Sequence, residues 1–95
     1  MPCSETSKAI MFYIYVLESL KNGNLYFGYT QDLKKRFTEH NRGLNKSTKP
    51  YLPWKIIYYE ACLNEKDAKR REGYLKTTQG QRLIKRRLKE YFYNK

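Results

Sequence analysis

The clearest pattern along the chain is an apolar run from Ile10 to Leu20, which predicts a β-strand. Apolar side chains fall on both faces of this strand, which favours a central position or cover on both sides. Asn22-Gly23 then predicts a two-residue type I′ turn, because both central residues of such a turn need positive φ. The returning strand would be Leu25–Gly28, and this turn places Tyr26 on the same face as Tyr15.

A helix, a loop and a third strand follow. Thr30 is the predicted N-cap of the helix, and Gly43 marks its predicted end. An i, i+3, i+4, i+7 spacing puts four residues on one face of this helix: Leu33, Arg36, Phe37 and His40. After a basic, proline-containing loop, Trp54–Glu60 predicts a third strand. Its alternation would set Ile56 and Tyr58 on one face, with Ile57 and Tyr59 on the other.

Two further helices complete the predicted fold. Asn64 and Asp67 open the first of them, whose shared face carries Ala68, Glu72 and Leu75. Thr78 and Gln81 form a capping-box pair at the start of the second. Its apolar stripe comprises Leu83, Ile84, Leu88, Tyr91 and Phe92. The order β-β-α-β-α-α predicts an α+β fold, in which helices flank a three-stranded, mostly antiparallel sheet. We expect a flexible segment over residues 1–9 and a single domain over residues 10–95.

The charge balance indicates a polyanionic partner. Twenty Lys and Arg against nine Asp and Glu give a net charge of +11, which favours DNA, RNA or an anionic membrane surface. A basic protein without a nucleic-acid partner is the weaker alternative. No apolar stretch is long enough to span a bilayer, so we expect no membrane association. Two cysteines and one histidine disfavour a disulfide framework or a zinc site, which fits a cytoplasmic protein.

Three polar residues on apolar helix faces are candidates for chemistry, and each also has an ordinary structural explanation. His40 fits a hydrogen-bonded histidine at the edge of the core, and Arg36 fits a solvated surface cation. Glu72 fits a surface carboxylate paired with Lys76 at i+4, or a carboxylate that binds Mg²⁺ together with water and a substrate phosphate. Any one of the ten tyrosines could simply be packed in the sheet.

The order and spacing of these residues resemble the GIY-YIG nuclease superfamily over residues 12–88. Tyr13-Ile14-Tyr15 and Tyr26-Phe27-Gly28 resemble its two naming motifs. The patterns Thr-x-x-Leu-x-x-Arg-x-x-x-His-Asn-x-Gly over 30–43 and Ala-x-x-x-Glu-x-x-x-Lys over 68–76 follow them. The whole pattern is similar to that of the small single-domain bacterial members. Tyr13 stands where the first motif has its glycine, Phe27 replaces isoleucine, and Tyr29 stands where some repair relatives have lysine.

The resemblance implies hydrolysis of phosphodiester bonds in DNA and a role for each of five residues. Tyr26 would act as general base or proton relay for the attacking water, and Arg36 would favour its phenolate. Tyr15 would hydrogen-bond in the same cluster. Arg36 would also stabilise charge on the phosphate, while His40 would assist proton transfer or hold the phosphate. Glu72 would bind one divalent ion, Mg²⁺ or Mn²⁺.

Basic residues around these positions are expected to contact the nucleic-acid backbone. They are Lys34, Lys35, Arg42, Lys46, Lys49, Lys69, Arg70 and Lys76. DNA is the expected partner, with RNA as an alternative, and no small-molecule substrate is expected. The leading interpretation is a metal-dependent DNA endonuclease, structure-selective or acting in repair or recombination. A basic nucleic-acid-binding protein with little or no catalysis is the alternative, and a protein-interaction module is the least favoured. The five residues together favour the enzyme over both, because binding alone does not require Glu72.

Overall fold

A computed structural model describes residues 10–94 as a three-stranded sheet flanked by helices. In chain order the elements are β1 (Phe12–Ser19), β2 (Leu25–Thr30), α1 (Leu33–Asn41), the 3-10 helix η1 (Lys49–Tyr51), β3 (Trp54–Cys62), α2 (Glu65–Leu75), α3 (Thr78–Arg87) and α4 (Lys89–Tyr93). The sheet is antiparallel, with the strand order β2-β1-β3, and it confirms the predicted α+β fold. The expected flexible segment over residues 1–9 lies outside the described residues. No helix within residues 10–94 has the length and apolar character needed to cross a membrane.

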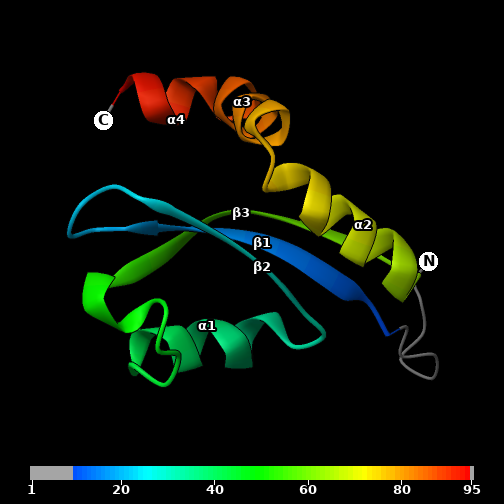
Figure 1. Cartoon of the computed structure of the whole chain (residues 1–95), viewed down its shortest axis with the longest axis horizontal. Helices are drawn as coiled ribbons and strands as arrows, with labels where there is room; N and C mark the ends of the chain where they lie inside the picture. Colours follow the sequence, from blue (N-terminus) through cyan, green and yellow to red (C-terminus); the bar gives the residue numbers. More distant parts are fainter. Residues whose placement is uncertain (1–9, 95) are drawn as a thin grey trace, which may run out of the picture.

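β1 is the central strand, and helices cover both faces of the sheet. Ile14 and Val16 on one face pack against α2 and α3. Tyr15 and Leu17 on the other face pack against α1 and Trp54. α1 therefore lies on one side of the sheet, with α2, α3 and α4 on the other (Figure 1). The two-sided burial predicted from the apolar run is confirmed.

The turn between β1 and β2 is longer than predicted. It spans residues 20–24, and Gly23 has a positive φ of 78° while no described non-glycine residue does, so the type I′ turn at Asn22-Gly23 is wrong. The Ser19 hydroxyl accepts hydrogen bonds from two backbone N–H groups of the loop, at 3.1 and 3.2 Å, which stabilises the wider turn. Tyr26 consequently opposes Leu17 instead of Ser19. This shift of two residues preserves the predicted face and brings Tyr26 closer to Tyr15.

Two predicted helix starts are displaced. α1 begins after Asp32, whose carboxylate accepts a first-turn N–H at 3.0 Å. Thr30 is not the cap, because it still belongs to β2. α3 begins after Thr77, whose hydroxyl accepts a first-turn N–H at 3.1 Å, one residue before the predicted Thr78. The last apolar stripe is divided between α3 and α4, because Leu88 leaves helical geometry, with φ −104° and ψ 34°.

β3 contains a bulge that overturns both predicted faces, because it separates Ile56 from Tyr58 and also Ile57, which packs on the α2 side, from Tyr59. The β1–β3 register shifts between two neighbouring pairs, Val16 with Tyr58 and Leu17 with Ile56. Ile56 therefore packs on the α1 side, whereas Tyr58 packs on the α2 side. The predicted shared faces are wrong because strict alternation assumes a strand without an extra residue. Tyr59 lies on the α1 side, and its ring meets that of Tyr13 edge to face at 6.0 Å.

Candidate active site

Four of the five residues assigned to catalysis meet on the α1 side of the sheet. Tyr15 comes from β1, Tyr26 from β2, and Arg36 and His40 from α1. Ring centroids lie 5.0 Å apart for Tyr26 and His40, 5.8 Å for Tyr15 and His40, and 6.3 Å for the two tyrosines. The guanidinium of Arg36 donates to the Glu39 carboxylate at 3.1 Å, and Arg36 also acts to lower the pKa of Tyr15 against the larger effect of burial. Residues from three separate elements thus form one polar and aromatic cluster.

A directional chain of hydrogen bonds fixes His40, which is fully buried. The Tyr15 hydroxyl lies 2.9 Å from Nε2 of His40, and the Thr48 hydroxyl lies 2.9 Å from Nδ1. The Thr48 hydroxyl also lies 3.4 Å from the carbonyl oxygen of Asn45, to which it can donate its proton. We therefore expect His40 to be a neutral imidazole with its proton on Nδ1, so that Nε2 accepts from the Tyr15 O–H.

Burial keeps both Tyr15 and His40 neutral near pH 7. It raises the pKa of Tyr15 to about 12, although the Arg36 guanidinium acts in the opposite direction. Burial also lowers the pKa of His40, and the Arg36 charge adds to that effect. At Tyr15, therefore, burial outweighs the effect of Arg36, which would favour a phenolate. Tyr15 stays a neutral phenol that is hydrogen-bonded to the histidine.

Gly28 makes room for the Tyr15 ring. The two residues oppose each other across β1 and β2. A Cβ atom at position 28 would overlap Cζ and Oη of Tyr15. The glycine lies within β2 and has no positive φ, so the close approach of this ring is the reason for a residue without a side chain. Only a glycine lets the Tyr15 hydroxyl reach His40 along this path.

The residues that support His40 were missed by the sequence analysis. Thr48 lies in the loop predicted only as basic, yet it is fully buried. Its carbonyl accepts the indole N–H of Trp54 at 2.9 Å. The Asn41 side chain in turn bonds the backbone N–H and carbonyl of Trp54, at 2.7 and 2.8 Å. Asn41, which follows His40 directly in the matched pattern, was the one sequence feature that could have pointed to this support.

Glu72 approaches the cluster from the helix layer on the other side of the sheet. Desolvation is the largest cause that raises the pKa of both Tyr15 and Tyr29, which lie on opposite faces at the β1–β2 pair, and the charge of Glu72 adds a small contribution to each. The carboxylate also forms the i+4 ion pair with Lys76 that was the ordinary alternative, at 3.1 Å. Its side chain is 22% exposed, so water can reach it. Glu72 is near the tyrosine cluster without being part of its hydrogen-bond network.

A divalent metal fits this position only as a singly anchored ion. Within residues 10–94 no three His, Cys, Asp or Glu side chains come together as a metal site. Glu72 offers one hard, partly exposed carboxylate, which suits Mg²⁺ or Mn²⁺ when water and a substrate phosphate complete the shell. The Lys76 ammonium would have to give way. One carboxylate cannot fill the coordination shell of a divalent cation, so Glu72 could hold the ion only together with water and phosphate oxygens.

The predicted phosphate-binding residues are all exposed, and they fall on two sides of the molecule. Those on α1 and the loop after it are Lys34, Lys35, Arg42, Lys46 and Lys49. The others lie on α2 and pair with acidic neighbours: Lys69 with Glu65, Arg70 with Asp67 and Lys76 with Glu72. No ion pair within residues 10–94 engages the first group, so it is more available to phosphates.

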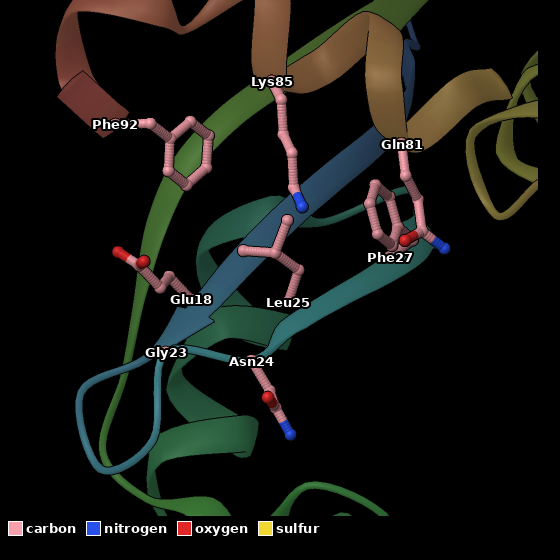
Figure 2. A pocket seen from close by; sticks show the side chains of 8 residues that line it. All are labelled: Glu18, Gly23, Asn24, Leu25, Phe27, Gln81, Lys85 and Phe92. Atoms are coloured by element: carbon pink, nitrogen blue, oxygen red, sulfur yellow. The ribbon is translucent and has the colours of Figure 1, made fainter. Parts of the chain in front are cut away.

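A separate hollow of about 520 Å³ lies on the α3 side of the sheet, next to the hairpin loop. Figure 2 shows the Lys85 side chain reaching into it, near Phe92 and Leu25. Glu18 in its wall accepts a hydrogen bond from Tyr91, which ties α4 to β1. None of the five predicted catalytic residues lines this hollow. The candidate chemistry is therefore carried by the tyrosine cluster.

Comparisons with known proteins agree with the geometry. The family model of the GIY-YIG catalytic domain matches residues 11–85. A UPF0213 protein of Streptococcus agalactiae serotype V is 45% identical over 65 residues, which cover 67% of this chain and 73% of that protein. A UPF0213 protein of Clostridium perfringens is 40% identical over 75 residues, covering 77% and 80%. The solution NMR structure of a UPF0213 protein from Bacillus halodurans is similar at a TM-score of 0.50 and 28% identity, over 78% of this chain and 81% of that one.

Proposed function

This chain belongs to the GIY-YIG catalytic-domain family, and we propose from that premise that it is a divalent-metal-dependent endonuclease acting on DNA. One observation carries the proposal. Tyr15, Tyr26 and His40 come from three elements and have ring centroids 5.0 to 6.3 Å apart, and the charge of Arg36 acts on Tyr15 and His40. A surface that only binds would not need these residues to converge. The net charge of +11 supports a polyanionic substrate.

Each residue of the cluster has a distinct part in this reaction. The Arg36 side chain is 35% exposed, so its guanidinium would contact the scissile phosphate and stabilise the charge of the transition state. Tyr26 is half-buried, and its hydroxyl would take or relay the proton of the attacking water. Tyr15 and His40, both neutral, would hold this arrangement by their hydrogen bond. A bound Mg²⁺ or Mn²⁺, held by Glu72, supplies Lewis-acid help to the leaving oxygen.

The direct test is a nicking assay on supercoiled and branched DNA with Mg²⁺, with Mn²⁺ and with a chelator. Glu72→Gln keeps the shape of the side chain and removes its charge, so we expect it to abolish metal-dependent cleavage in a folded protein. Lys76→Met is the matched control, because it breaks the same ion pair and leaves the carboxylate in place. Cleavage by Glu72→Gln at the wild-type rate would show that the assigned metal role is wrong.

The second candidate is a nucleic-acid-binding protein without catalysis, which the Glu72–Lys76 ion pair favours. Arg36→Ala separates the two. In an enzyme it should lower the cleavage rate far more than the affinity, because only contacts stronger in the transition state speed a reaction. Both quantities would be measured on one DNA at fixed salt. No cleavage by the wild type, or equal losses in rate and affinity, would favour the binding protein.

A further inference from the structure

A second hollow, about 470 Å³ in volume, adjoins the tyrosine cluster on the α1 side of the sheet. We name it the tyrosine hollow and define it by six of its lining residues: Tyr13, Leu33, Lys34, Phe37, Ile56 and Tyr59. Tyr59 directly opposes Tyr15 across β1 and β3. Tyr13 precedes Tyr15 by two positions on β1 and so shares its face. The tyrosine hollow is therefore next to the candidate catalytic residues.

One aromatic ring in the tyrosine hollow is open to solvent, and a second, half-buried ring lies beside it. Tyr59 is 54% exposed, and half-buried Tyr13 meets it edge to face with the ring centroids 6.0 Å apart. Phe37 and Ile56 form an apolar floor behind them. Volumes of this size and an apolar lining with few polar groups are typical of sites that take a flat organic group. Tyr13 stands at the position of the glycine in the first motif, so this chain has an aromatic side chain where that motif has no side chain.

We propose that the tyrosine hollow binds an unpaired nucleobase of the DNA substrate, stacked on Tyr59 beside Tyr13. The charges around the tyrosine hollow, as well as its shape, suit a nucleotide. Lys34 lines the tyrosine hollow, is exposed and forms no ion pair within residues 10–94, so a phosphate beside a bound base can meet this cation. The carboxylate of Asp32, which also lines it, accepts a backbone N–H of α1.

The base must be unpaired, because neighbouring bases cover both faces of a base inside a duplex. A single-stranded, frayed or extruded base presents a free face, and stacking on an aromatic ring tolerates any sequence. The inference rests on the proposed function, since it names the form of DNA that the nuclease would take. It predicts a preference for DNA with unpaired nucleotides near the cleavage point.

The test measures binding separately from cleavage. Affinity for a single-stranded oligonucleotide carrying one 2-aminopurine, and for the matching duplex, is measured by anisotropy at fixed salt in the Glu72→Gln background, which prevents cutting. Tyr59→Leu keeps an apolar strand residue and removes the ring. We expect it to weaken single-strand binding by roughly 5- to 150-fold and to leave duplex binding unchanged. The 2-aminopurine fluorescence should be quenched on binding, and less so with Tyr59→Leu.

Three controls keep the result interpretable. Tyr59→Phe retains the ring and should bind as well as Tyr59. Tyr93→Leu removes a tyrosine that is 82% exposed on α4 and should change nothing. Tyr13→Leu gives a second ring deletion if Tyr59→Leu proves unstable in thermal denaturation. Equal losses for single strand and duplex, or no loss with either ring deletion, would overturn the proposal. A selective loss in a protein that never cleaves DNA would uphold the stacking site and refute the nuclease.

Discussion

Replacing Thr48 by valine tests the hydrogen-bond chain that orients the candidate catalytic histidine. Valine has nearly the same shape but lacks the hydroxyl that accepts Nδ1–H of His40 at 2.9 Å. Both residues are fully buried, so water does not replace the lost partner. We expect the proton of His40 to move to Nε2 in this variant, which leaves Nδ1 without a partner and takes the acceptor away from the Tyr15 hydroxyl. A buried polar group left unpaired costs about 1–3 kcal/mol, which is the expected loss in the free energy of unfolding.

The chain has one histidine, so the ring ¹⁵N shifts of His40 can be measured without ambiguity. We expect the Nδ1-protonated pattern in the wild type and in Thr48→Ser, which keeps the hydroxyl. Thr48→Val should lose that pattern and cleave DNA up to roughly 5- to 150-fold more slowly, if the whole 1–3 kcal/mol reaches the transition state. A wild-type histidine protonated on Nε2, or a Thr48→Val variant with unchanged shifts, would refute the reasoning.

Three further predictions follow from the same geometry. Gly28→Ala should displace the Tyr15 ring and lower the nicking rate far more than the melting temperature, because the added Cβ overlaps that ring; equal rates would contradict it. Stability should fall as pH drops below about 6.5, because the folded-state pKa of His40 lies below that unfolded value; His40→Gln should flatten this part of a pH series of urea titrations. DNA affinity should fall steeply with salt, and Lys35→Gln should reduce the log–log slope by about one.

Features that depend on a few neighbouring residues could be predicted from the sequence alone. The apolar residues on both faces of the Ile10–Leu20 run predicted a covered central strand, and the structure has it as β1. The spacing of Leu33, Phe37 and His40 predicted one helix face, and these side chains do face the sheet. Such periodicity is local, because each side chain's direction follows from the backbone repeat of its own element.

Only the tertiary structure decided how these elements meet. The five-residue turn after Ser19 and the bulge in β3 set which tyrosines lie side by side, and both depend on pairing between distant segments. Thr48 can contact His40 because the Trp54 indole N–H hydrogen-bonds the Thr48 carbonyl and holds the loop after α1 in place. No local sequence pattern predicts this contact. The sequence by itself determined the family, the helix and strand faces and the candidate residues. Their hydrogen bonds, protonation and neighbours required the fold, because burial and contact are properties of the assembled layers.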